Sequence, residues 1–158
     1  MFKCWDMNEG LFGNILLVED DDAHAILVTR NLTKFMSKGR INRVSNGEEA
    51  LNYLLGKDKK PNNQPNIPPT LILLDLKLPR IGGLDLLKQI KSHPKLRKIP
   101  TVILTSSEAK PDVEKAYEYN ANSYIVKPLD FSRFSQLLQD LYTYWNKWNT
   151  NLIYAKSQ

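Results

Sequence analysis

The sequence predicts an α/β fold, in which a five-stranded parallel sheet is covered by helices on both faces. Five short apolar stretches recur along the chain, and each is followed by a stretch with helical spacing. Most of the short stretches are apolar without alternation, which is typical of strands buried between two layers of helices. A length of 158 residues fits one domain of this kind.

The first two strand and helix units lie in the first third of the chain. "NILLVE" (14–19) is short and apolar, and "DAHAILVTRNLTKFM" (22–36) follows it with apolar residues at helical spacing. "RINRVS" (40–45) alternates as a strand does, and "GEEALNYLL" (47–55) indicates a helix.

Three further units complete the repeat. Their predicted strands and helices are "TLILLD" (70–75), "GLDLLKQIK" (83–91), "PTVILT" (100–105), "KPDVEKAYEYN" (110–120), "SYIV" (123–126) and a long final helix capped by Asp130. The whole pattern predicts a doubly wound sheet in three layers, αβα, as a (βα)5 unit with flavodoxin-like strand order.

The chain divides into three segments by pattern. Residues 1–12 are expected to be a loose leader, residues 13–140 the domain, and residues 141–158 an extension of the last helix and a tail. Within the domain, residues 56–69 contain four prolines and no periodicity. This insertion is longer than most loops between a helix and a strand.

Composition excludes several classes of protein. The 22 Lys and Arg residues exceed the 17 Asp and Glu residues and give a net charge of +5, but they are scattered, so nucleic-acid binding is not expected. Cys4 is the only cysteine, which excludes an internal disulfide and fits a reducing compartment. No apolar run approaches the ~18 residues of a membrane span. We expect a soluble cytoplasmic protein.

Polar side chains follow the ends of four predicted strands. They are Glu19, Asp20 and Asp21 after the first, Asp75 at the end of the third, Thr105 at the end of the fourth and Lys127 after the fifth. In a doubly wound fold the ligand site lies outside these strand ends. Converging carboxylates repel one another unless a cation intervenes, and Mg²⁺ with oxygen ligands leaves room for a phosphoryl group. We therefore expect Asp75 to be a nucleophile on which an acyl phosphate forms.

The residues at these strand ends resemble a known family. "ILLVEDD", "LILLDLKLPRIGG", "VILTSS" and "YIVKP" are similar to the signature blocks of response-regulator receiver domains, in the same order and on the corresponding strands. The resemblance covers roughly residues 13–140. It implies a single-domain regulator that takes a phosphoryl group from a sensor histidine kinase, with switching rather than turnover as its task.

The resemblance implies a role for each site residue. Asp75 is the phosphoacceptor. Glu19 and Asp20 are the acid pair that binds Mg²⁺, for which Mn²⁺ or Ca²⁺ can substitute, and Lys77 adds its backbone carbonyl. Thr105 binds the phosphoryl oxygens.

The same resemblance implies roles for residues in and after the fifth predicted strand. Lys127 also binds the phosphoryl oxygens and is followed by Pro128 through a cis bond. Tyr124 is the aromatic residue that turns inward when Thr105 moves toward the phosphate.

Two points stay open. The acid pair could instead be Asp20 and Asp21; with Glu19 and Asp20 as the pair, Asp22 is expected to cap the first helix. The second residue after the acceptor is Lys77, where an uncharged polar residue is more usual. We hypothesise that its ammonium pairs with the phosphoryl group and slows hydrolysis; the alternative is that it points into solvent.

The last helix is unusually aromatic. We expect a stripe that faces the sheet and runs through Phe131, Phe134, Leu137, Leu138, Leu141, Trp145 and Trp148. Tyr142 and Tyr144 then face elsewhere, and this aromatic surface (Tyr142, Tyr144, Trp145 and Trp148) is typical of an interface. We expect a homodimer through the fourth helix, fifth strand and fifth helix.

The proline-rich insertion and the aromatic tail also resemble regulators that serve bacterial, often cyanobacterial, phytochrome-type sensor kinases. The downstream target is not indicated. Two alternatives remain: an interaction module that works through the aromatic helix without phosphorylation, and a small Mg²⁺-dependent phosphotransferase or phosphatase with an aspartyl nucleophile. His24 and His93 are interpreted as surface positions.

Overall fold

The structure is a computed structural model that describes residues 13–36, 39–58 and 67–152. The predicted leader at 1–12 and residues 59–66 of the proline-rich insertion lie outside the described residues. Within the described residues, no helix is both long and apolar enough to span a membrane.

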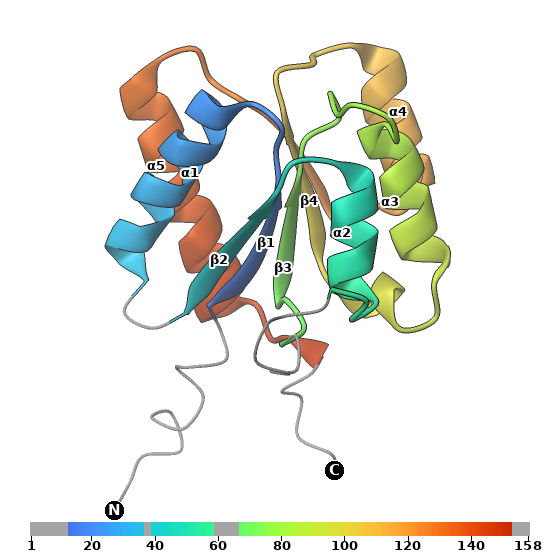
Figure 1. Cartoon of the computed structure of the whole chain (residues 1–158). Coiled ribbons are helices and arrows are strands. Elements are labelled where there is room, and N and C mark those ends of the chain that lie inside the picture. The colour runs from blue at the N-terminus through green and yellow to red at the C-terminus, as the bar shows by residue number, and fades with distance from the viewer. Residues whose placement is uncertain (1–12, 37–38, 59–66, 153–158) are drawn as a thin grey trace, which may run out of the picture.

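Five parallel strands form one sheet in the order β2-β1-β3-β4-β5 (Figure 1). The strands are β1 (Asn14–Val18), β2 (Arg40–Val44), β3 (Leu71–Leu74), β4 (Thr101–Thr105) and β5 (Ser123–Val126). This order confirms the predicted flavodoxin-like topology. Since β1 and β3 are neighbours inside the sheet, the residues that follow them lie side by side at its carboxyl edge.

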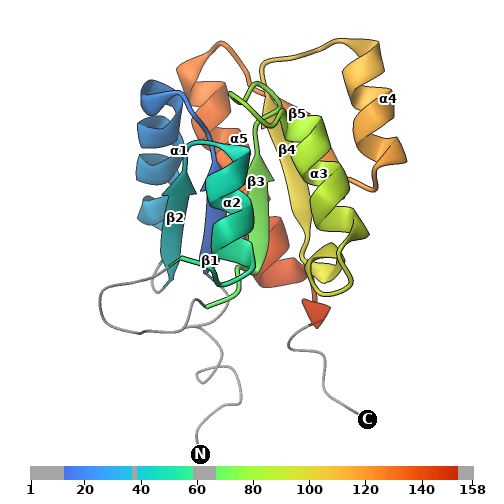
Figure 2. The same ribbon diagram turned by 45° about the vertical axis from the view of Figure 1, so that its right-hand side comes forward.

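Helices cover both faces of the sheet and complete three layers (Figures 1 and 2). The helices α1 (Asp22–Phe35) and α5 (Phe131–Thr143) pack on one face. On the opposite face lie α2 (Gly47–Leu54), α3 (Gly83–Ser92), α4 (Lys110–Glu118) and the short 3₁₀ helix η1 (Leu96–Lys98).

The central strands are apolar on both sides because each side has its own core. In β1, Leu16 and Val18 face α2 and α3, whereas Ile15 and Leu17 face α1 and α5. All four side chains are at most 2% exposed. Burying one such side chain contributes about 1.5–3 kcal/mol, which explains why these strands lack the alternation of a half-exposed sheet.

The helix starts confirm one predicted cap and correct another. Asp130 caps α5, and its Oδ1 accepts a hydrogen bond from the backbone N–H of Arg133 at 2.8 Å. The prediction that Asp22 caps α1 is wrong, because Asp21 has the extended conformation of a cap and accepts from His24 N at 2.8 Å. Asp22 is instead the first helical residue.

The C-terminal part of the last helix also differs from the prediction. After α5 the chain continues as a π-helix, η2 (Tyr144–Trp148). A π-turn holds more residues than an α-turn, so side chains beyond it rotate away from the α-helical stripe. Trp148 is therefore 73% exposed instead of facing the sheet, whereas Tyr142 packs against the core. Tyr144 is exposed as expected.

Beyond η2 the chain is tied to the amino edge of the sheet. The Asn151 side chain is buried, and its amide donates to the carbonyl of Thr70, just before β3, at 3.2 Å. Asn14 at the start of β1 reaches the same region and donates to the Ile67 carbonyl at 2.8 Å. These asparagines tie backbone carbonyls outside the strands to the amino edge of the sheet.

Gly83 supports the loop that carries Asp75, and we expect Gly83→Ala to destabilise the protein. A Cβ at this position would lie 2.3 Å from the Asp75 carbonyl oxygen and 2.5 Å from Leu76 Cα. Relieving such overpacking costs about 1–3 kcal/mol. The free energy of unfolding, measured by urea titration, should fall by that amount.

The matched control is Gly82→Ala, because a Cβ on Gly82 meets nothing within 4 Å and its backbone is extended. Equal stability of the two variants would contradict the proposed close approach.

Candidate functional site

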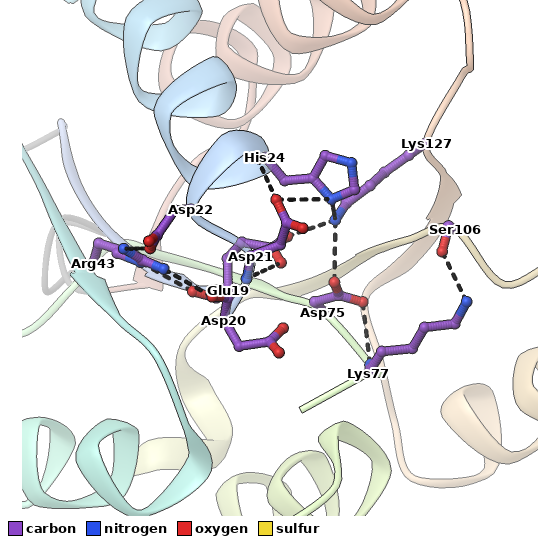
Figure 3. A network of polar contacts seen from close by, with 10 residues as sticks. All are labelled: Glu19, Asp20, Asp21, Asp22, His24, Arg43, Asp75, Lys77, Ser106 and Lys127. Atoms are coloured by element: carbon purple, nitrogen blue, oxygen red, sulfur yellow. Dashed lines mark hydrogen bonds and ion pairs between the residues drawn. The ribbon is translucent and has the colours of Figure 1, made fainter. Parts of the chain in front are cut away.

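The sheet delivers the predicted polar residues to one place at its carboxyl edge. Glu19 and Asp20 follow β1, Asp75 follows β3, Thr105 ends β4 and Lys127 follows β5. Figure 3 shows the acidic side chains and Lys127 converging there. The topology alone brings these positions together, although they span more than half of the sequence.

Three carboxylates form the acidic part of the site. Oxygens of Glu19, Asp20 and Asp75 all lie within 4.8 Å of one another. Glu19 and Asp75 are 1% and 6% exposed, whereas Asp20 is open to solvent. Asp21 is not in this group, since its carboxylate caps α1. The geometry thus groups Glu19 with Asp20, as the preferred register of the acid pair requires.

Lys127 places one ammonium between the two buried carboxylates. Its Nζ lies 2.5 Å from Glu19 Oε2 and 3.1 Å from Asp75 Oδ2. The Lys127 side chain is itself 5% exposed. Buried charges are tolerated when they are paired and hydrogen-bonded in this way.

The surroundings shift the pKa values of the two buried carboxyl groups in opposite directions. Burial raises the pKa of Glu19, and its hydrogen bond to Lys127 opposes this only in part. Burial acts on Asp75 as well, but the Lys127 ammonium and the backbone N–H of Lys77 outweigh it and hold the pKa of Asp75 below its ordinary value. Asp75 is therefore ionised at neutral pH.

The donor set fits a hard divalent cation. When ionised, Glu19, Asp20 and Asp75 carry three negative charges, and Lys127 compensates one of them. The remaining two match a divalent ion, and carboxylate oxygens with an open side toward solvent suit an ion that keeps several waters. The carbonyl of Lys77 as a further ligand stays a prediction.

Lys77 spans the mouth of the site. Its backbone N–H donates to Asp75 Oδ1 at 3.2 Å, and its ammonium donates to Ser106 Oγ at 3.0 Å. Figure 3 shows the side chain reaching from the loop after β3 to the loop after β4. Lys77 is exposed, as the alternative expected, and its ammonium also bonds to a neighbouring loop. Its pairing with a phosphoryl group stays a prediction.

Thr105 and Tyr124 are connected through the loop after β4. Thr105 is fully buried, and its Oγ1 accepts from Ser107 N at 3.4 Å. The Tyr124 hydroxyl donates to the carbonyl of Ser107 at 3.0 Å. Ser107 Oγ donates in turn to Asp112 of α4. A displacement of Thr105 would therefore change the hydrogen bonds that Ser107 makes with Tyr124 and α4.

The structure adds two residues that the sequence interpretation missed. His24 has a side chain that is 45% exposed, as the surface interpretation expected, but its Nδ1 also lies 3.2 Å from Lys127 Nζ. Arg43 of β2 donates to the carbonyls of Glu19 and Asp20 at 3.0 and 3.1 Å. This contact could not be predicted from the sequence, because Arg43 binds backbone carbonyls, which every residue has.

The cis bond between Lys127 and Pro128, which the family resemblance implied, is not present. Among the described residues there is no cis peptide bond, so Lys127 and Pro128 are joined in trans. The trans form is intrinsically favoured by about 0.5–1 kcal/mol before proline.

Comparison with known proteins agrees with this geometry. Residues 15–139 match the family model described as the response regulator receiver domain. The chain is 39% identical to the probable methanogenesis regulatory protein FilR2 of Methanothrix harundinacea, over 85% of this chain and 84% of the relative. It is 34% identical to the response regulator Rcp1 of Synechocystis sp., over 83% of this chain and 87% of the relative.

Solved structures give the same result. The phosphorylated cyanobacterial phytochrome response regulator RcpA superposes with a TM-score of 0.80 at 33% identity, covering 87% of this chain and 96% of that one. The Mn²⁺-bound form of Rcp1 superposes with a TM-score of 0.79 at 33% identity, covering 88% and 98%. With its parallel sheet, acidic edge and matched motifs, the chain belongs to the response regulator receiver domain family of two-component signalling proteins.

Proposed function

We propose that Asp75 accepts a phosphoryl group from the phosphohistidine of a sensor histidine kinase and that the modification changes a surface read by a partner. The observation that carries this proposal is the placement of Asp75. Its Oδ2 is 3.1 Å from Lys127 Nζ, and it shares a 4.8 Å cluster with Glu19 and Asp20. The protein is a signalling switch, and it assists its own phosphorylation and dephosphorylation.

Asp75 has the properties of a nucleophile in such a transfer. Its lowered pKa keeps the carboxylate ionised. In the transfer, the phosphorus–nitrogen bond of the phosphohistidine breaks, a phosphorus–oxygen bond forms to Asp75, and the electron pair leaves with the imidazole. Little covalent work is left for the protein, so catalysis depends on position and charge.

The neighbouring residues supply that position and charge. We assign Mg²⁺ to Glu19, Asp20 and Asp75; when bound, it supplies positive charge next to the phosphoryl oxygens. Lys127 donates hydrogen bonds from its ammonium to a phosphoryl oxygen, and Thr105 does so from its hydroxyl. Both side chains are buried. The Lys127 ammonium already lies beside Asp75 and is preorganised for the transfer, whereas Thr105 has to shift to reach the phosphoryl group.

The first prediction tests the acceptor. Incubation with Mg²⁺ and acetyl phosphate should add the mass of one phosphoryl group to the wild-type protein and none to Asp75→Asn, as measured by intact mass. The asparagine keeps the shape of the site but lacks the nucleophilic oxygen charge. Omission of Mg²⁺ should abolish the addition. Equal labelling of both proteins would place the acceptor elsewhere.

The second prediction concerns Lys77. The Ser106 contact places the Lys77 ammonium at the site mouth, where it can pair with the phosphoryl group and hinder the attacking water. We expect Lys77→Asn to hydrolyse the acyl phosphate faster by roughly twofold to fivefold, the effect of losing one exposed ion pair. The decay of phosphorylated protein, followed by intact mass, measures this.

The control for this test is Lys110→Asn, which removes a lysine whose side chain is 85% exposed on α4. An unchanged lifetime in Lys77→Asn would remove the hypothesis and leave Lys77 as a loop contact.

The response to phosphorylation is proposed to pass through Thr105 and Tyr124. If Thr105 shifts toward the phosphoryl group, Ser107 N loses its acceptor and the carbonyl that holds Tyr124 moves. The face formed by α4, β5 and α5 would then change. We propose that this face forms a homodimer and that the kinase partner is of phytochrome type, as the names of RcpA and its kin suggest for those proteins.

The α5 side of this face carries suitable apolar surface. A groove of about 510 Å³ runs between β5 and α5 and ends at Tyr144 and Trp145. Tyr144 and Trp148 are 54% and 73% exposed. Exposed aromatic side chains beside a groove are common at protein interfaces.

The third prediction concerns assembly. The double variant Tyr144→Ala, Trp148→Ala should shift the protein from dimer to monomer in analytical ultracentrifugation, because it removes the exposed aromatic area. The control is Phe131→Ala, which removes a 65% exposed aromatic side chain at the other end of α5. A wild-type monomer with and without acetyl phosphate would refute the dimer.

The exposed aromatic pair also supports a second function, an interaction module that does not depend on phosphorylation. In that case Asp75→Asn would associate as the wild type does, and acetyl phosphate would leave the assembly unchanged. The acidic cluster and Lys127 favour the switch, since burying these charges without a use for them is costly.

A further inference from the structure

We propose that His24 is a positioning residue of the phosphoryl-transfer site and that it acts by holding the ammonium of Lys127. The inference rests on the proposed function of Asp75 and adds a residue to its site. Figure 3 shows the His24 ring beside the end of the Lys127 side chain, whose Nζ also points to Asp75.

The first argument is the set of partners that the described residues place around the ammonium. A lysine ammonium has three donors and no acceptor. Lys127 Nζ has three acceptors within reach, namely Glu19 Oε2 at 2.5 Å, Asp75 Oδ2 at 3.1 Å and His24 Nδ1 at 3.2 Å. Each donor is thus used once, and the three acceptors together fix where the ammonium lies.

The second argument is the protonation state that the contact requires. Since Lys127 can only donate, His24 Nδ1 must accept, and the ring is then the neutral tautomer with its proton on Nε2. The Asp21 carboxylate lies 4.0 Å from Nδ1, too far for a hydrogen bond. Asp21 instead accepts from the backbone N–H of His24, which fixes the first turn of α1 under the ring.

The third argument is what happens when the phosphoryl group arrives. One oxygen of Asp75 becomes part of the acyl phosphate, and Glu19 belongs to the set proposed for the metal. Lys127 must then turn a donor toward a phosphoryl oxygen. His24 is the one acceptor of the three that neither reaction nor metal engages. It can therefore hold Lys127 throughout, and preorganised donors are what such sites rely on.

The test uses three substitutions of different reach. In asparagine, Oδ1 stands at the same number of bonds from Cα as His24 Nδ1 does, so His24→Asn keeps an acceptor in place. His24→Gln moves it one bond further out, and His24→Ala removes it. Ile26→Ala on the exposed side of α1 is the control, since Ile26 is 52% exposed.

We expect His24→Ala and His24→Gln to be phosphorylated by acetyl phosphate about threefold to tenfold more slowly than wild type at saturating Mg²⁺, the range for one hydrogen bond. His24→Asn and Ile26→Ala should keep the wild-type rate. Equal rates in all five proteins would overturn the inference but leave Asp75 as the acceptor. Equally slow His24 variants, asparagine included, would also overturn it.

A second measurement is independent of phosphorylation. Long-range ¹H–¹⁵N correlation spectra of the wild-type protein should show His24 with a bare Nδ1 and a protonated Nε2, whereas a proton on Nδ1 overturns the contact. A wild type that takes up no phosphoryl group overturns the proposed function together with this inference.

Discussion

The pairing of one buried ammonium with two buried carboxylates is the interaction on which the rest of the structure depends. Removing one partner of such a group costs about 3–5 kcal/mol, because the other charge stays buried and uncompensated. Lys127, Glu19 and Asp75 directly follow three different strands. They can meet only if β1, β3 and β5 are parallel and end at the same edge, so the charge cluster and the topology require each other.

Other parts of the fold keep this cluster in position. Arg43 reaches across from the edge strand and holds the carbonyls of Glu19 and Asp20, and its ion pair with Asp22 at 2.7 Å fixes the start of α1. Gly83 lets α3 approach the backbone that carries Asp75. These residues bear no reactive group toward the site. These residues limit the freedom of the loops. In a reaction whose rate depends on the position of the reacting groups, this restriction helps catalysis.

The order of the elements and the acidic edge could be predicted because both follow from local patterns. Unbroken apolar runs indicate buried strands, and parallel strands gather whatever follows them. Contacts that depend on a single turn could not be predicted. The cap of α1 is Asp21 and not the predicted Asp22, because the backbone of Asp21 is extended. The π-helix directs Trp148 outward, where an α-helix would have directed it toward the sheet. The surface position of His24 was expected, but its contact with Lys127 was not, since the two residues are 103 positions apart in the sequence.

The hydrogen bond from Asn151 to Thr70 attaches the C-terminal segment to one end of β3, whereas the site carboxylate lies at the other end. Thr70 precedes β3 at one edge of the sheet, and Asp75 follows β3 at the other. The aromatic turn is therefore anchored at the end of β3 that is remote from the carboxylates. If the aromatic turn binds a partner, as proposed, its residues can change at the anchored end without disturbing the charges at the other end. Under that proposal, the four-residue strand β3 would keep changes of binding partner separate from the phosphoryl chemistry.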